Sequence, residues 1–145
     1  MEQVASEKIA QNWVTWLDAL ASGKYRNVSS ELHAHMEDET EGHCCLGVAQ
    51  IVLGLDRSFF TSTDHRLIPL LGMHTSCGIS RSDRNYSKSI TDFNDVDHME
   101  DVDFTNMHRV LLDDLEGFTH LHPEVAPLVR KMLAERERDM NTTIG

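Results

Sequence analysis

Apolar residues recur at helical spacing near the start of the chain. They share one face of a helix that the pattern predicts from about Val4 to Ala21: Ile9, Trp13, Trp16, Leu17 and Leu20. Ser22 and Gly23 follow, and glycine tolerates the left-handed conformation that ends many helices. We therefore expect an amphipathic first helix whose two tryptophans belong to the core.

Two elements of different period come next. Strict alternation over 31–36 sets His33 and His35 on one side and apolar residues on the other, which is typical of a short, half-buried strand. A compact apolar run from Cys44 to Leu55 then returns to helical spacing. Its small residues would allow another helix to pack closely. We predict a buried central helix there, with apolar positions Cys45, Val48, Ala49, Val52 and Leu53.

Residues 56–91 carry no clear period. We predict an irregular connection, with a short strand or turn near 67–71 and a small hairpin within the segment. A long connection of this kind in a compact domain often has a functional role.

Two further helices are expected in the last third of the chain. Asp103 is a good N-cap for the first, which should run to about Gly117 with the stripe Phe104, Met107, Leu111, Leu115 and Phe118. The second should begin near Pro123 or Pro127, because proline is tolerated at a first helical position. We expect Arg136 and Arg138 in its last turns, a frayed end over 140–145, and a buried face of Val125, Leu128, Val129, Met132 and Leu133.

The pattern as a whole predicts a mainly α fold, with α+β as the alternative. About four helices would pack on one core, with a small β-hairpin or short strands, in a single globular domain over 1–145. No apolar run approaches the roughly 18 residues that span a bilayer, and the N-terminus does not resemble a signal peptide. Three cysteines, two of them adjacent, do not suggest a disulfide framework. We therefore expect a cytoplasmic protein without a membrane partner.

Charge narrows the classes of partner. Acidic residues outnumber basic ones by 24 to 13, a formal net charge of −11. Such a field repels phosphate backbones, so we expect no direct nucleic-acid binding. It suits a basic protein surface, although net charge also simply keeps a small protein in solution, and we favour that simpler explanation of the overall value.

An acidic tract stands out ahead of the helix that Asp103 caps. A calcium loop would need oxygen ligands at alternate positions and a glycine at the sixth, which the tract lacks. It could instead dock on a basic patch, although such runs are more often solvated loops. The candidate partner-binding residues are Asp92, Asp95, Asp97, Glu100 and Asp101.

Histidines and cysteines offer two further candidates. His33 and His35 on one strand face, with the pair His74 and Cys77, have ligand types that zinc prefers. Chance clustering of surface histidines is the alternative, so we expect no cofactor, with zinc as the exception. Cys44 at a helix start could be a thiol nucleophile with a nearby histidine as base; the alternative is that both adjacent cysteines are packing residues. No phosphate-binding or nucleophile-elbow motif occurs.

Three motifs carry a family resemblance. They are the segment from Trp16 to Tyr25, the Cys-Cys-Leu-Gly-Val run at 44–48, and the Asp-Phe-Asn-Asp loop at 92–95 ahead of a helix that opens with Asp103 and Phe104. The chain thereby resembles a family of small uncharacterised proteins encoded by tailed bacteriophages and prophages, over roughly the first 55 residues and the 90–118 region. The middle segment and the histidine-rich strand depart from the family pattern.

The resemblance implies a phage origin and a place in the cytoplasm of the infected bacterial host. Small phage proteins often bind and inhibit a host enzyme or defence factor, which is an analogy of class. We therefore expect an accessory protein that inhibits or redirects a host bacterial protein. The alternatives are a thiol- or zinc-dependent enzyme centred on Cys44 and the nearby histidines, an acidic nucleic-acid mimic, and a structural phage component; a homodimer is possible.

Overall fold

The computed structural model describes residues 5–22, 24, 26–27, 33–35, 41–43, 45–55, 65–73, 75, 90 and 105–144. Within these ranges the chain is mainly helical, as predicted. The helices are α1 (Ser6–Ala21), α2 (Cys45–Val52), α3 (Leu67–Leu71), α5 (Thr105–Asp113), α6 (Leu115–Phe118) and α7 (Val125–Ile144). The strands are β1 (Arg26–Asn27), β2 (His33–His35) and β3 (Glu41–His43).

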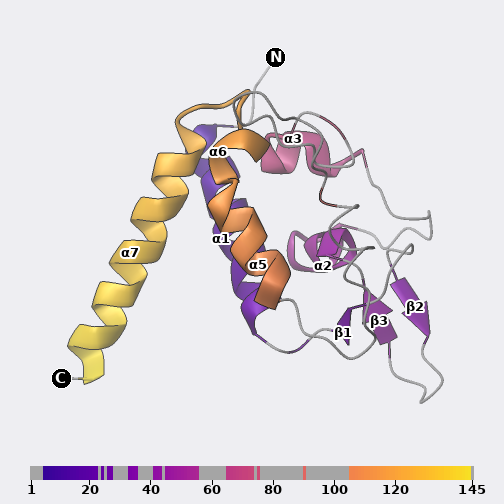
Figure 1. Ribbon diagram of the computed structural model, residues 1–145, viewed down its shortest axis with the longest axis horizontal. Helices are drawn as coiled ribbons and strands as arrows, with labels where there is room; N and C mark the ends of the chain where they lie inside the picture. The colour runs from indigo at the N-terminus through magenta and orange to yellow at the C-terminus, as the bar shows by residue number, and fades with distance from the viewer. Residues whose placement is uncertain are drawn as a thin grey trace.

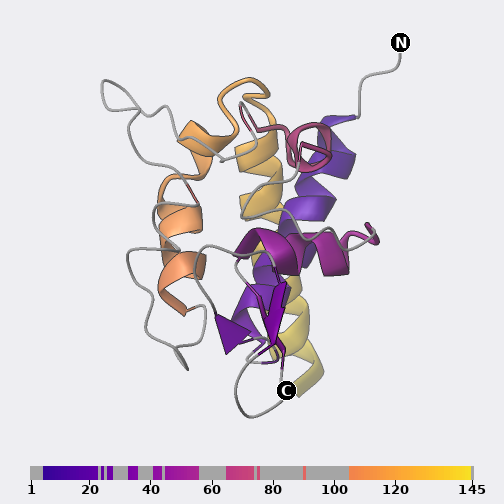
Figure 2. The same ribbon diagram turned by 90° about the vertical axis from the view of Figure 1, so that its right-hand side faces the viewer.

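Helix α1 is the centre of the fold. It contacts α7, α2, α3 and α5, and α7 and α5 lie along it while α2 runs across it (Figures 1 and 2). The predicted apolar stripe is confirmed, since Trp13, Trp16 and Leu17 are fully buried and Ile9 and Leu20 nearly so. The core therefore forms around the face of α1 that the sequence pattern indicated.

The two tryptophans of α1 join hydrophobic packing to hydrogen bonding. Their ring centroids lie 5.1 Å apart, and the Trp13 ring also packs near Phe118. Trp13 Nε1 donates to the carbonyl oxygen of Leu71 at 2.7 Å, and Trp16 Nε1 donates to that of Cys45 at 2.8 Å. Each indole is thus satisfied inside the core and ties α1 to a distant segment of the chain.

Helix α2 is the predicted buried central helix. Cys45, Val48 and Ala49 are fully buried, whereas Val52 and Leu53 are partly buried and pack against the core. The helix ends at Val52 and is followed by Gly54, whose φ of 78° lies in the left-handed region that glycine adopts without steric cost. The amide of Leu55 then donates to the carbonyl of Gln50, which completes a Schellman-type cap.

The prediction of a strand or turn near 67–71 is wrong, because this segment forms helix α3. Pro69 is compatible with the helix since it lies in the first turn, where backbone amides have no helical acceptor. Gly72 ends the helix with φ 62°. Asn12 Nδ2 donates to the carbonyl of Leu70 at 2.8 Å, beside the bond from Trp13. Side chains of α1 therefore satisfy the C-terminal carbonyl groups of this short helix.

The single helix predicted up to Gly117 is two helices, α5 and α6. The chain breaks at Asp114, with φ −107° and ψ 22°, yet the apolar stripe remains continuous, and Leu111, Leu115 and Phe118 are fully buried. With α3, this break raises the number of helices among the described residues to six, against the four or so expected. Phe104 lies outside the described side chains.

Helix α7 begins at Val125, between the two prolines proposed as its start, with Pro127 in its first turn. Val125 and Val129 are buried, and Leu128, Met132 and Leu133 are partly buried. The helix continues to Ile144, since no glycine or proline interrupts the pattern before the last residue. Arg136 and Arg138 consequently lie before its last turn. Fraying over 140–145 stays a prediction.

The three strands form one small sheet in the order β1-β3-β2. β1 pairs with β3 in parallel, and β2 pairs with β3 antiparallel. The sheet lies beside α2, which β3 contacts (Figure 1). Residues 36–40, which connect β2 to β3, lie outside the described residues, as does most of 56–91, where the hairpin was expected.

Candidate functional site

The predicted site residues fall mostly outside the described part of the chain. This holds for all five acidic residues of the candidate partner-binding surface, Asp92, Asp95, Asp97, Glu100 and Asp101, and for His74, Cys77 and Cys44. Docking through the acidic tract and thiol chemistry at Cys44 therefore stay predictions. Only His33 and His35 belong to a described element, strand β2.

The backbone register of the sheet places these two histidines opposite two further polar residues. His33 is paired with His43, and His35 is paired with Glu41, with Ala34 and Gly42 between them. Residues alternate between the faces of a sheet, and directly paired residues share a face. One face of the β2–β3 ladder therefore carries three histidines and one glutamate.

His43 is the one residue of these four whose side chain is described, and it is buried. The side chain of His43 is only 4% exposed, beside the start of the buried helix α2. The sequence pattern predicted a half-buried strand with His33 and His35 on its polar side. The pairing partner of His33 is nevertheless buried, which alternation along a single strand could not reveal.

Cys45 has a structural role. It is fully buried, it is not part of a disulfide bond, and its carbonyl oxygen accepts the indole hydrogen bond from Trp16. The interpretation of this cysteine as a packing residue is confirmed. A nucleophile must be accessible to substrate, so Cys45 cannot take the role proposed for its neighbour.

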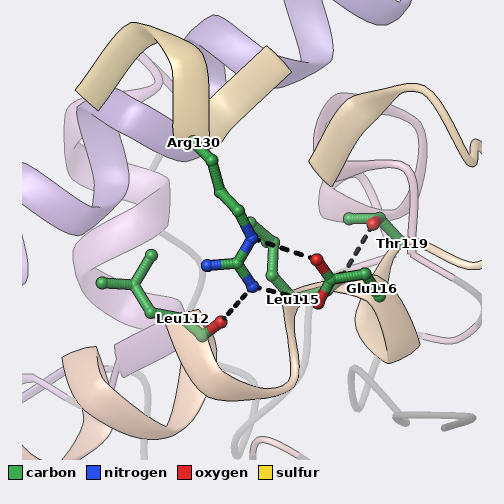
Figure 3. A network of polar contacts seen from close by, with 5 residues as sticks. All are labelled: Leu112, Leu115, Glu116, Thr119 and Arg130. Carbon is green, nitrogen blue, oxygen red and sulfur yellow. Dashed lines mark hydrogen bonds and ion pairs between the residues drawn. The ribbon is translucent and has the colours of Figure 1, made fainter. Parts of the chain in front are cut away.

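Figure 3 shows a polar network that joins the α5–α6 break to α7. Arg130 donates from Nε and Nη2 to the two carboxylate oxygens of Glu116, both at 3.0 Å, and from Nη2 to the carbonyl of Leu112 at 2.8 Å. The hydrogen bond from Arg130 is the main cause that lowers the pKa of Glu116. The hydroxyl of the buried Thr119 donates to the carbonyl of Leu115. Arginine thus caps a backbone carbonyl at a helix break.

A second set of interacting polar side chains lies where α1, α5 and α7 approach one another. Arg136 of α7 donates a hydrogen bond to the carboxylate of Asp18 on α1, and the two side chains also form an ion pair. Burial lowers the pKa of His108 on α5, and the negative charge of Asp18 partly opposes this shift. Sequence reasoning missed both arginine pairs, since their members are 14 and 118 positions apart and no local pattern relates them.

Stability should depend on pH through His108. The pKa of this histidine is lower in the folded state than in the unfolded chain, so the unfolded chain takes up a proton first as the pH falls. The contribution of His108 is fully present above about pH 6.5 and is lost below it. We expect the loss of unfolding free energy between about pH 7.5 and about pH 5.5 to be smaller in His108→Gln than in the wild type.

Urea unfolding followed by tryptophan fluorescence at both pH values would measure this difference. His65→Gln, at an exposed position, is the matched control. A pH dependence reduced equally by both substitutions would contradict the assignment to His108.

No group of three or more metal-ligating residues is found among the described residues; the side chains of His33, His35 and Glu41 are outside that set. No described helix has both the length and the apolar character needed to cross a membrane. Comparison of the chain with protein-family models, curated proteins and solved structures finds no match.

Proposed function

We propose that this chain is a phage-encoded accessory protein that binds a host bacterial protein and inhibits or redirects it. The observation that supports a binding role is the clustering of six carboxylates in the tract at 92–103. The phage assignment is supported by the motif resemblance at 16–25, 44–48 and 92–95.

Acidic residues are clustered in the sequence at 92–103. The chain has 24 acidic and 13 basic residues, and six of the acidic ones lie within these twelve positions, which contain no lysine or arginine. The tract thus accounts for −6 of the formal net charge of −11. A need for solubility alone would not require this clustering. It favours recognition of the tract by a basic surface on a partner protein.

Some of the charge on the described helices is paired within the protein. Arg130 pairs with Glu116 and Arg136 pairs with Asp18. Such pairs contribute little net field at a distance because their opposite charges largely cancel. We therefore place the partner-binding surface on the acidic tract at 92–103, where six carboxylates and no lysine or arginine occur within twelve positions.

Charge reversal tests this surface. The variant Asp95→Lys/Asp97→Lys/Asp101→Lys should bind the host partner about tenfold or more weakly, and the affinity of the wild type should fall as salt is raised. The partner is first identified by capture from host lysate and mass spectrometry. Its affinity for purified variants is then measured by calorimetry.

A matched control separates local from global charge effects. The variant Glu7→Lys/Glu135→Lys/Glu137→Lys changes the net charge by the same amount at exposed helix positions and should retain near wild-type affinity. If both variants bound the partner equally weakly, the net charge of the protein and not the tract itself would determine the affinity. Unchanged affinity in the Asp variant would remove the tract from the interface.

A further inference from the structure

The break between α5 and α6 lies in a segment whose sequence is suited to one continuous helix. Leu111, Leu115 and Phe118 follow one another at positions i, i+4 and i+7, and all three are fully buried, although the break lies between the first and the second. This spacing is the repeat of a single helical face. A continuous helix over this segment would therefore bury the same three side chains.

The broken segment keeps part of the hydrogen bonding of a helix. The amide of Asp114 donates to the carbonyl of Val110 at 3.1 Å, and the amide of Phe118 donates to the carbonyl of Asp114 at 3.0 Å. Both bonds have the helical pattern from residue i to residue i−4. A regular helix would also join the amide of Glu116 to the carbonyl of Leu112, and this bond is not among the backbone bonds of the described residues.

Arg130 and Glu116 satisfy the two backbone groups that would form this bond. Arg130 donates to the carbonyl of Leu112 at 2.8 Å and holds the carboxylate of Glu116 through two hydrogen bonds of 3.0 Å (Figure 3). The same carboxylate accepts a hydrogen bond from the backbone amide of Glu116. Backbone donors and acceptors that lose their helical partner need another one. The ion pair thus takes the place of one helical hydrogen bond at the break.

The ion pair lies at the surface, where other groups can reach it. The side chain of Arg130 is 45% exposed and that of Glu116 is 62% exposed. Exposed ion pairs contribute little net stability, and one backbone hydrogen bond contributes a similarly small net amount because water competes for both of its groups. The broken and the continuous forms of the segment are therefore close in free energy.

We propose that residues 105–118 are a two-state element, which is a broken helix when Arg130 binds Glu116 and the carbonyl of Leu112, and one continuous helix when this contact is opened. Arg130 belongs to α7, so α7 controls the shape of the segment that packs beside it. A molecule that competes for Arg130 or Glu116 would shift the population toward the continuous helix. The proposal does not depend on the proposed binding of a host protein.

Nuclear magnetic resonance of Arg130→Met in the full chain tests this proposal. Methionine keeps an unbranched apolar side chain and removes the guanidinium group. The φ of Asp114 is −107° in the broken helix, against about −63° in a regular one, so we expect its three-bond amide–Hα coupling to fall to the helical value. Hydrogen exchange of the amide at position 116 should slow by about tenfold or more, because this amide then donates to Leu112. Glu116→Ala should change both quantities in the same direction.

Arg136→Met is the matched control. It opens the other arginine pair of α7, with Asp18 on α1, and should leave the coupling of Asp114 and the exchange at position 116 as in the wild type. Wild-type values of both quantities in Arg130→Met and Glu116→Ala would show that the break does not depend on the ion pair. Loss of helical chemical shifts over 105–118 in Arg130→Met would also refute the proposal, since the segment would then unfold instead of joining. Near-ultraviolet circular dichroism of the two tryptophans shows whether the core of each variant remains folded.

Discussion

Replacing Trp13 by alanine is expected to lower the free energy of unfolding by about 3–5 kcal/mol. The ring is fully buried and packs against Trp16 and Phe118, so its removal leaves a cavity at the centre of the fold. The substitution also deprives the carbonyl of Leu71 of its indole donor, and a buried carbonyl left unpaired costs about 1–3 kcal/mol. Total stability is typically about 5–15 kcal/mol, so a substantial fraction of it would be lost.

Urea unfolding monitored by far-ultraviolet circular dichroism would measure this loss, and Trp16 provides a fluorescent reporter in the variant. Trp13→Phe keeps most of the ring and removes the hydrogen bond, so its smaller effect separates packing from hydrogen bonding. Leu121→Ala is the surface control, because this leucine is 54% exposed and should change stability by less than about 0.5 kcal/mol. A Trp13→Ala protein as stable as Leu121→Ala would refute the assigned core.

The second large effect is expected at Gly72. Its φ of 62° costs a residue with a side chain about 1–2 kcal/mol. An added Cβ would also lie 2.9 Å from His122 Cδ2 and 3.2 Å from Ile9 Cγ2. Ile9 is buried and cannot move freely, and overpacking of this kind costs about 1–3 kcal/mol. We expect Gly72→Ala to destabilise the protein by about 2–4 kcal/mol in total.

Gly54→Ala is the matched control for this substitution. Gly54 has a similar backbone conformation, with φ 78°, but an added Cβ would meet no atom within 4 Å beyond its immediate chain neighbours. It should therefore show the conformational cost alone, about 1–2 kcal/mol. Thermal unfolding of both variants would give the difference. Equal destabilisation would show that α1 and the turn before α7 do not pack tightly around Gly72.

The helical faces were predictable because periodicity reports burial directly. Ile9, Trp13 and Leu17 on α1, and Val125 and Val129 on α7, lie where the pattern put them, in the core. The predictions of local secondary structure failed where contacts with distant residues outweigh the hydrophobic pattern of the segment. Residues 67–71 form a helix because α1 satisfies its last carbonyls and Gly72 ends it, and the break at Asp114 is stabilised from another helix by Arg130. Neither partner can be identified from the local sequence.

The candidate site was predictable only in part for a related reason. Alternation over 31–36 predicted a strand that contains His33 and His35, and β2 (His33–His35) is that strand, but the pattern could not supply the strand that lies beside it. The register with β3 adds His43 and Glu41. Residues that are paired in a sheet come from segments whose register is set by the fold, so the sequence pattern of one strand does not identify the residues opposite it.

The packing of α1 against α7 has a consequence for synthesis of the protein. These helices lie at opposite ends of the described chain and are in direct contact, and Arg136 and Asp18 pair across 118 positions. While the chain emerges from the ribosome, the apolar face of α1 cannot complete its packing until α7 has been translated. Folding of this core should therefore wait until α7 has left the ribosome, and the apolar face of α1 would be exposed to chaperones until then.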